Sequence, residues 1–377
     1  MIKLGSICDF QSGGTPSKGK IEYFNGDIPW ITTTSLNGSR IDEKDAVNWI
    51  TEKAIKETAA RIVPANSIMV GTRVGVGKVA INTIDMSTSQ DVISLLNIDE
   101  KKWSKDYLCK FIQGKSAYLN SQARGATIKG IKIDVLANLE VPTIDYKQQQ
   151  FISETIDAVR SVISARRREL HILDELIRAR FVEMFEDEKN LMAMSDICSI
   201  ITDGTHQPPK FKKDGIPFIF VSNITGDKLT YDAEKFIDQD TYDELVKRTP
   251  IEIGDVLLST VGSYGHPAVV KSEKKFLFQR HIAYLKPRRE FVDSDYLHGA
   301  ILSPEAQRQI EEGVKGIAQK TLNLSEIKKM RIPVPNMVKQ KEFAAFVSHV
   351  DKSKAVIQKS LDEMQLLFDS LMQQYFG

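Results

Sequence analysis

Apolar residues in alternating steps of three and four mark one long stretch of the chain, from about residue 145 to residue 186. The apolar positions of this first series are Ile152, Ile156, Val159, Ile163, Leu170, Leu173, Ile177 and Met184. Arg166 and Arg180 occupy the two steps at which the apolar series is interrupted. This spacing predicts a long helix whose apolar seam packs along another helix.

The same series returns at the C-terminus, where Phe343 stands 191 positions after Ile152 and Tyr375 stands 191 positions after Met184. The members of this second series are Phe343, Val347, Val350, Lys354, Ile357, Leu361, Met364, Phe368, Leu371 and Tyr375. We therefore expect one helix of about 40 residues, about 60 Å long, to occur twice in the chain.

The rest of the chain also repeats itself. Gly14-Thr15 corresponds to Gly204-Thr205, and Gln90 corresponds to Gln279. Longer matches join Leu4–Cys8 with Met194–Cys198, Ile28–Ile31 with Ile216–Ile219, and Ser67–Thr72 with Asp255–Thr260. The separations stay between about 187 and 193 residues, which indicates tandem duplication of a globular segment followed by a helix.

Within each globular segment, short β-branched runs bounded by Gly, Pro and Asn predict strands. In the first segment these runs cover Ile28–Thr33, Ser67–Val70, Lys78–Ile84 and Val92–Leu96. One helix is predicted over Lys105–Asn120, and its partner in the second segment over Ser294–Gly313. Each segment is therefore expected to be an α+β domain with a β-rich body.

Connectivity predicts how the long helices run. Asp145, with Gln148 three residues later, and Asn336 are suitable N-cap residues for the two helices. The second globular segment joins the end of the first helix to the start of the second, and the ends of a compact domain usually lie close together, so the helices should pack antiparallel.

The predicted fold class is α+β, with two tandem β-rich mixed domains that are each followed by a long helix. The two helices are expected to form an antiparallel coiled coil with pseudo-two-fold symmetry. The predicted boundaries are 1–143 and 188–335 for the globular domains, and 144–187 and 336–377 for the helices.

Composition narrows the class of protein. The 377-residue chain is 42% hydrophobic and 27% charged, which is ordinary for a globular protein, and its net charge is +1. It has neither an apolar run long enough to span a bilayer nor a recognisable secretory signal, so we expect a cytoplasmic protein without membrane contact. Cys8, Cys109 and Cys198 lack the spacing of a disulfide or zinc framework and are expected to be buried free thiols.

Catalytic motifs are missing from the sequence, so we expect a non-catalytic chain without a cofactor or metal of its own. Gly75-Val76-Gly77-Lys78 departs from a phosphate-binding loop because Thr72 and Val79 stand where that motif needs Gly and Ser or Thr. We expect a turn between strands there. The six histidines do not have the spacing of metal ligands.

Polar and basic loops recur at the same places in both globular segments. Lys and Arg can neutralise phosphates, whereas Ser, Thr, Asn, Gln and Arg can read base edges. The residues predicted to contact DNA are Thr15, Lys18, Lys20, Thr33, Thr34, Ser35, Arg73, Lys78, Thr88, Gln90, Arg124, Lys129, Thr205, His206, Lys210, Lys212, Ser222, Asn223, Tyr264, His266, Gln279, Arg280, His281 and Lys320. A retained framework with divergent loops indicates one task directed at two targets.

This duplicated layout resembles the DNA-specificity subunit of type I restriction-modification systems, over essentially the whole chain. The features that carry the resemblance are Leu4–Thr15 with Gly14-Thr15-Pro16, Ile28–Ile31, Gly125-Ala126-Thr127, Val141-Pro142, and the helix end Leu176–Phe185 with its counterpart Leu367–Gly377. The second copy departs from the pattern at Gly204-Thr205-His206, where His206 follows Thr in place of Pro.

The resemblance implies that the globular segments are target-recognition domains, that each reads one half of an asymmetric bipartite double-stranded DNA site, and that the coiled coil sets the gap. It also implies two modification (methyltransferase) subunits that carry S-adenosylmethionine and two restriction (motor-nuclease) subunits that use ATP and Mg. The residues alone leave a second interpretation open, in which the chain is a two-headed protein-interaction scaffold without DNA binding.

Overall fold

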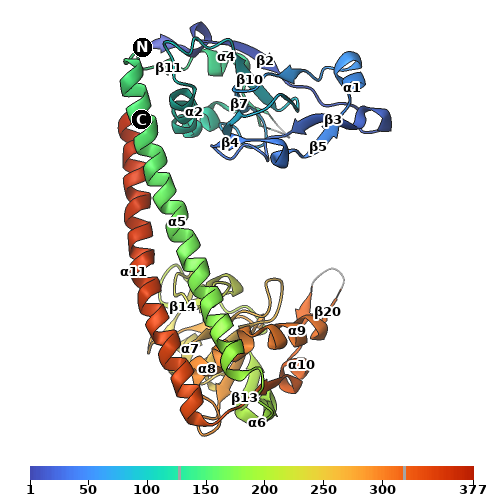
Figure 1. Cartoon of the computed structure of the whole chain (residues 1–377). Coiled ribbons are helices and arrows are strands. Elements are labelled where there is room, and N and C mark those ends of the chain that lie inside the picture. Colours follow the sequence, from blue (N-terminus) through green and yellow to red (C-terminus); the bar gives the residue numbers. More distant parts are fainter. Residues whose placement is uncertain (126–128, 317–319) are drawn as a thin grey trace. The chain divides into compact units, whose positions relative to one another are not determined.

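The computed structural model describes residues 1–125, 129–316 and 320–377, and its two long helices are the most extended elements (Figure 1). These helices are α5 (Tyr146–Phe185) and α11 (Met337–Phe376), each of 40 residues. The chain divides into a first unit, Met1–Ala165 with Ser360–Gly377, and a second unit, Arg166–Lys359. Each unit therefore contains one globular body and a stretch of both long helices.

The first unit is built on two sheets. One sheet has the order β2-β10-β7-β8-β4, and the other has the order β5-β3-β9-β6. Their strands are β2 (Asp9–Ser12), β3 (Phe24–Ile31), β4 (Arg40–Ile41), β5 (Asn48–Ile50), β6 (Ile62–Val63), β7 (Ile68–Gly71), β8 (Val79–Asn82), β9 (Met86–Thr88) and β10 (Val92–Leu96). A short pair, β1 (Ile2–Lys3) with β11 (Glu140–Val141), and helices α1 (Glu52–Glu57), α2 (Lys105–Gly114), α3 (Ser116–Gln122) and α4 (Ile133–Ala137) complete this unit.

The second unit repeats this topology. Its sheets have the orders β13-β19-β16-β17 and β15-β14-β18, which correspond to β2-β10-β7-β8 and β5-β3-β9. The strands are β13 (Cys198–Asp203), β14 (Ile216–Ile219), β15 (Phe236–Ile237), β16 (Val256–Ser259), β17 (Pro267–Val269), β18 (Leu277–Phe278) and β19 (Ile282–Pro287). The shared strand order confirms the duplication that the sequence predicts.

Smaller elements surround these sheets. They are the pairs β12 (Leu191–Ala193) with β22 (Arg331–Pro333) and β20 (Val314–Lys315) with β21 (Thr321–Leu322), and the helices α6 (Met194–Ile197), α7 (Gln239–Leu245), α8 (Ser294–Leu302), α9 (Pro304–Gly313) and α10 (Leu324–Lys329). None of the helices in the described part of the chain is long and apolar enough to cross a membrane.

The long helices occur where the apolar periodicity predicts them, but the shorter helix predictions are wrong in one respect. Each of the two predicted shorter helices is a pair, α2 with α3 and α8 with α9. In the second pair, Ser303 caps the new helix by accepting a hydrogen bond from the Ala306 N–H, and Pro304 cannot donate the N–H that a continuous helix requires. In the first pair, Lys115 interrupts the helix with a ψ of 6°.

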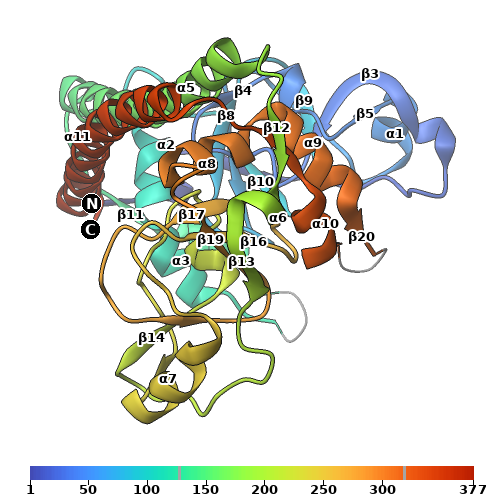
Figure 2. The same ribbon diagram turned by 90° about the horizontal axis from the view of Figure 1, so that it is seen from below.

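Within each unit α5 and α11 lie side by side and run antiparallel (Figure 1, Figure 2). In the second unit Asp174 pairs with Lys354, and Phe181, further along α5, packs edge-on against Phe343, nearer the start of α11. In the first unit the Arg160 guanidinium lies 5.6 Å from the centre of the Phe368 ring. The predicted seam residues are buried or half-buried along both helices.

Aromatic residues, most of them outside the apolar series, fill the contact between helices and globular bodies. In the second unit Phe181 and Phe185 pack with Tyr296 and Phe343 at ring-centre distances of 5.1 to 5.8 Å. In the first unit Phe376 lies 5.5 Å from Tyr107, between ring centres. These rings join the helix pair and the globular body of each unit into one apolar core.

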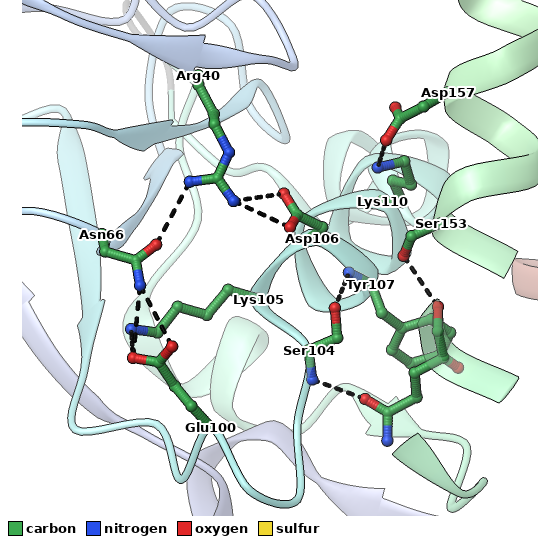
Figure 3. A network of polar contacts seen from close by, with 11 residues as sticks. Arg40, Asn66, Glu100, Ser104, Lys105, Asp106, Tyr107, Lys110, Ser153 and Asp157 are labelled. Atoms are coloured by element: carbon green, nitrogen blue, oxygen red, sulfur yellow. Dashed lines mark hydrogen bonds and ion pairs between the residues drawn. The ribbon is translucent and has the colours of Figure 1, made fainter. Parts of the chain in front are cut away.

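A polar network holds α2 between the sheet and α5 (Figure 3). Arg40, on the edge strand β4, donates two hydrogen bonds of 2.9 and 3.0 Å to the Asp106 carboxylate. On the other side of α2, the ammonium of Lys110 lies 2.7 Å from the Asp157 carboxylate on α5, and the Lys110 side chain is only 6% exposed. A buried ammonium needs such a partner, so this pair fixes the register of α2 against α5.

A buried glutamine at the same position of each long helix ties the helix start to the globular body. Gln149 accepts a hydrogen bond of 2.8 Å from the N–H of Ser104, the N-cap residue of α2, and its amide donates to the carbonyls of Lys102 and Ile144. Gln340 stands 191 positions later and makes the same three bonds, with the N–H of the α8 N-cap Asp293 and the carbonyls of Phe291 and Pro335. Both side chains are fully buried.

The two units differ at a second equivalent position of the long helices. In the first unit Arg160 donates hydrogen bonds of 2.7 Å to the carbonyl of Gly38, in the loop after β3, and to the side chain of Gln113 on α2. Asp351 takes the same place in the second unit and carries the opposite charge. Its carboxylate lies 3.5 Å from the Lys228 ammonium and 3.7 Å from that of Lys271. We call Arg160 and Asp351 the helix latches.

The glutamine contacts predict a stability difference between neighbouring glutamines of one helix turn. Gln149→Ala should lower the free energy of unfolding of the first unit by about 1–3 kcal/mol, because it leaves a buried N–H and two carbonyls without partners. Gln150→Ala is the matched control, because Gln150 is exposed. Denaturant unfolding of the full chain measures both, and equal stability of the two variants would contradict the assignment.

The first latch predicts a local change in hydrogen exchange. The Gly38 N–H donates to the Val79 carbonyl at 2.7 Å, and Arg160 holds the carbonyl of the same residue. Arg160→Gln should raise the exchange rate of the Gly38 amide by about tenfold, because a charged hydrogen bond contributes about 1.5 kcal/mol or more. Arg167→Gln, an exposed residue of α5, should leave the rate unchanged. Equal exchange rates of the Gly38 amide in the two variants would contradict the role assigned to Arg160.

Candidate nucleic-acid interface

The strand registers of the first unit bring several predicted contact loops to one edge. Ser12 at the end of β2 pairs with Ile93, and Gly71 at the end of β7 pairs with Val92, both at the start of β10. In the second sheet the ends of the parallel strands β3 and β9 meet, because Ile31 pairs with Thr88. The loops 13–20, 32–39, 72–78 and 89–91 leave the sheets from these strand ends.

The loop after β2 lies directly against the end of β9. The Gly13 N–H donates to the Val92 carbonyl at 3.1 Å, and the Gly14 N–H donates to the Thr88 carbonyl at 2.9 Å. A Cβ atom on Gly13 would lie 2.2 Å from the Thr88 hydroxyl, so a side chain cannot be accommodated at this position. Close backbone approach is therefore the reason for a glycine here.

The second unit closes its loops with the same bonds. The Gly204 N–H donates to the Ile282 carbonyl at 3.2 Å, and the Thr205 N–H donates to the Phe278 carbonyl at 2.9 Å. A Cβ atom on Gly204 would lie 2.2 Å from the Phe278 oxygen. The two edges therefore share one backbone framework, whatever side chains they carry.

These bonds correct two of the predicted correspondences by one residue. Gly204 is equivalent to Gly13 and not to Gly14, because both donate to the first residue of β10 or β19. Gln279 is equivalent to Ser89 and not to Gln90, because Ser89 N–H donates to Ile31 and Gln279 N–H donates to Ile219 in the same way. Residue identity gives the wrong register at these positions, because backbone hydrogen bonding sets the register.

The corrected register pairs residues of different chemistry at the two edges. Thr15 corresponds to His206, Gln90 to Arg280, and Asp91 to His281. The Thr72 N–H donates to the Asp91 carbonyl at 2.8 Å, and the Thr260 N–H donates to the His281 carbonyl at 2.9 Å, which fixes the last of these pairs. The framework is shared while the side chains at each equivalent position change.

Most of the predicted contact residues of the first unit are exposed. The exposed ones are Thr15, Lys18, Lys20, Thr34, Arg73, Lys78, Gln90, Arg124 and Lys129. The structure brings four of them into one contiguous region, since the Thr15 hydroxyl accepts a 3.4 Å bond from the Gln90 N–H, and Arg73 and Arg124 both pair with Gly130 through the backbone. The predicted motif residues Ala126 and Thr127 lie outside the described residues.

One predicted lysine of this unit already has protein partners. Lys20 donates a 3.0 Å hydrogen bond to the Tyr23 hydroxyl, which in turn donates to Glu57. The bond to Tyr23, followed by its charge and that of the nearby glutamates, raises the pKa of the exposed Lys20 ammonium. Lys20 therefore remains a cation over a wide pH range, with its position set by Tyr23.

Four predicted contact residues are buried and expose little or no surface. They are Thr33, Ser35, Thr88 and Asn223. Ser35 donates to the Asp45 carbonyl at 2.7 Å, and Asn223 accepts from the Phe220 N–H and donates to Asp232. A polar side chain just beyond a strand is as often used to close the turn as to face solvent, and the pattern alone does not separate the two.

In the second unit, predicted contact residues lie beside an ion pair between Asp203 and Arg248, which the sequence does not reveal. Asp203, at the end of β13, lies 2.9 Å from the His206 imidazole and 2.5 Å from the Arg248 guanidinium. Arg248 comes from the short 3-10 helix η5 (Val246–Arg248). Thr205 and Gln279 form a parallel bridge beside this group.

Arg280 and His281 lie next to each other on the same edge, with 3.4 Å between Arg280 Nε and His281 Nε2. Partial burial, and then the charge of Arg280, lower the pKa of His281 below its ordinary value. The imidazole is therefore neutral at neutral pH and can donate or accept a hydrogen bond. A guanidinium beside a neutral imidazole can hydrogen-bond to base edges.

The other predicted residues of the second unit are largely engaged with the protein itself. Lys320 pairs with Glu311 at 3.0 Å, and the Tyr264 hydroxyl donates to the same carboxylate, which lowers the pKa of Glu311. Lys212 lies 3.4 Å from Asp238. His266 lies 2.8 Å from the Asp227 carboxylate, whereas Lys210 and Ser222 are exposed.

Two further kinds of reactive group are metal-ligand clusters and thiols. Within the described residues there is no group of three or more His, Cys, Asp and Glu side chains that could hold a metal ion. Cys8, Cys109 and Cys198 are buried free thiols, as predicted. Burial raises the pKa of each thiol to about 12, so the three are protonated and unreactive at neutral pH.

Comparisons with known proteins fit this duplicated architecture. The family model described as "Type I restriction modification DNA specificity domain" matches residues 1–171 and 186–365. The type I restriction enzyme MjaIX specificity subunit of Methanocaldococcus jannaschii is 24% identical, with 98% of this chain and 90% of that protein covered. The EcoBI specificity subunit of Escherichia coli is 20% identical, with 74% of this chain and 67% of that protein covered.

Solved structures support the same fold. The S subunit of a type I restriction-modification system from M. genitalium has a TM-score of 0.55 at 14% identity, with 100% of this chain and 95% of that chain covered. A chain solved in a study of complex assembly and conformational transition of the type I R-M system has a TM-score of 0.60 at 15% identity, with 100% and 96% covered. The family model covers most of the sequence, and the chain therefore belongs to the type I restriction-modification DNA specificity family.

Proposed function

We propose that this chain is the sequence-reading subunit of a type I restriction-modification complex, and that each of its two units reads one half of an asymmetric bipartite site in double-stranded DNA. Members of this family are specificity subunits, and the catalytic activities of such systems reside on partner subunits. The observation that carries the proposal is the pair of equivalent edges, which share their backbone bonds but differ in the side chains they expose.

The chemistry of the two edges supports different base preferences. The first unit offers Thr15, Gln90 and Asp91, a set of hydroxyl, amide and carboxylate groups. At the equivalent positions the second unit offers His206, Arg280 and His281. An amide suits the donor and acceptor of adenine, whereas a guanidinium suits the two acceptors of guanine, so the two half-sites should differ in sequence.

The long helices supply the spacing between half-sites in this proposal. A helix of 40 residues is about 60 Å long, and one turn of duplex DNA is about 34 Å, so a helix pair of this length can set a gap of about one turn or more. The partners we propose are two modification subunits with S-adenosylmethionine and two restriction subunits with ATP and Mg, in the cytoplasm of the host cell.

The proposal predicts a genome-wide pattern of DNA methylation that depends on this gene. Cells with active modification subunits should carry one split methylated motif, which disappears when the gene is deleted. Replacing residues 1–143 by the corresponding segment of another family member should change one half of the motif and keep the other half. Sequencing of modified bases measures the motif. A methylation pattern that is the same with and without the gene would contradict DNA reading and favour a protein-interaction scaffold.

Single residues of one edge should affect one half-site. Arg280→Gln should weaken binding to the native site by about 1–3 kcal/mol and relax base preference at one position of the second unit's half-site, because a bidentate contact to guanine is lost. Competition binding with a set of singly substituted duplexes measures the preference. Lys189→Gln is the control, because Lys189 is exposed and lies before β12, outside the loops that form this edge. Relaxed preference in the other half-site would contradict the assignment.

A further inference from the structure

A pocket of about 460 Å³ in the first unit has a lining whose charged side chains are all basic. Arg73 comes from the turn between β7 and β8, Arg124 follows α3, and Lys132 precedes α4. The sequence marks Arg73 and Arg124 as candidate contacts but gives no reason to group them with Lys132, which is adjacent only in the fold. The pocket adjoins the edge described above, because Arg73 follows Thr72, whose N–H binds the Asp91 carbonyl.

Backbone bonds hold the three basic residues in place. Arg124 and Gly130 exchange N–H to carbonyl bonds of 2.9 and 3.0 Å, and the Ile131 N–H donates to the Thr72 carbonyl at 2.9 Å. A Cβ atom on Gly130 would lie 2.6 Å from Cγ of Arg73, so glycine allows the two segments to approach this closely. The basic groups therefore stand on a fixed frame and not on independent loops.

The charge of this pocket is poorly compensated by the protein. The Arg73 guanidinium lies 3.7 Å from the Asp91 carboxylate, with both side chains partly exposed. In the described part of the chain, no acidic side chain lies within ion-pair distance of Arg124 or Lys132. Like charges held together in a concave site raise the local positive potential and attract anions.

The second unit keeps the frame of this pocket but not its charge. The Leu322 N–H donates to the Thr260 carbonyl at 2.8 Å, as Ile131 does to Thr72, and Lys315 pairs with Thr321 as Arg124 pairs with Gly130. Val261 and Asn323 stand at the positions of Arg73 and Lys132, and Lys315 is 3.7 Å from Glu326. The fold itself therefore does not require three basic side chains here.

We propose that the pocket lined by Arg73, Arg124 and Lys132 binds one phosphodiester group of the DNA backbone beside the half-site of the first unit. This inference rests on the proposed function. Two guanidinium groups and an ammonium supply only hydrogen-bond donors. A phosphate offers several acceptor oxygens that point in different directions, whereas the few acceptors of a base edge lie in one plane. The pocket therefore suits a phosphate better than a base. The contact positions the first unit on the duplex and carries no base information.

The test is DNA binding by the assembled complex with its modification subunits, over a range of salt concentrations. Arg124→Gln/Lys132→Gln should weaken binding to the native site and to unrelated DNA by the same factor, about tenfold at low salt. The slope of log K against log salt concentration should become less steep by about one, as expected for one phosphate contact. The methylated motif should stay unchanged.

Two further variants sharpen the result. Lys101→Gln/Lys102→Gln removes the same charge beyond the far end of β10, and it should leave affinity and salt slope as in the wild type. Arg124→Lys/Lys132→Arg keeps both positive charges, so its dependence of log K on log salt concentration should have the wild-type slope. An unchanged slope in the double glutamine variant, or a changed motif, would overturn the phosphate assignment. If instead the wild-type complex has no preferred sequence, the proposed function itself fails.

Discussion

One buried amide group at the start of each long helix is the constraint on which the rest of the structure depends. Gln149 and Gln340 each join three segments that would otherwise end in unpaired polar groups: the loop before α2 or α8, the N-cap of that helix, and the turn into the long helix. Each hydrogen bond alone contributes little, but leaving any of these buried groups unpaired is costly. The direction in which a long helix leaves its globular body is therefore set by hydrogen bonds with defined geometry, and the aromatic contacts then fill the space around them.

Sequence periodicity predicts the two long helices and the duplication because both depend on patterns that extend over tens of residues. Periodicity does not predict the features that depend on single residues. Periodicity predicts one helix over Ser294–Gly313 although Pro304 marks a break there, and the matching break at Lys115 has no such marker. Gln149 and Gln340 recur at the repeat distance, yet a glutamine flanked by other polar residues gives no hint that it is buried. Burial around the candidate site is predicted least well, because Thr88 and Asn223 have the same polarity as exposed residues, and the contact of Arg248 with Asp203 depends on the fold.

The one-residue corrections at Gly204 and Gln279 explain how the two edges can differ so much in chemistry. The bonds that define each edge are made by backbone N–H and carbonyl groups, with a glycine only where the backbones touch. Side chains at Thr15, Gln90 and their equivalents add only a few contacts to this backbone framework: the Thr15 hydroxyl accepts a long bond from the Gln90 N–H, His206 pairs with Asp203, and Arg280 contacts His281. Substitutions there change what the edge can bind at little cost to folding, which is the arrangement that loops on a rigid scaffold commonly provide.

The opposite charges of Arg160 and Asp351 have a consequence for how a duplicated chain folds correctly. Because the long helices are copies of each other, either globular body could in principle settle on the helix stretch that belongs to the other. In that exchange Arg160 would face the ammonium groups of Lys228 and Lys271, and Asp351 would face the carbonyl of Gly38 and the side-chain oxygen of Gln113. The first encounter places like charges together, and the second places the carboxylate against two hydrogen-bond acceptors. The opposite charges of the latches would therefore disfavour an exchange of the two helix stretches between the globular bodies.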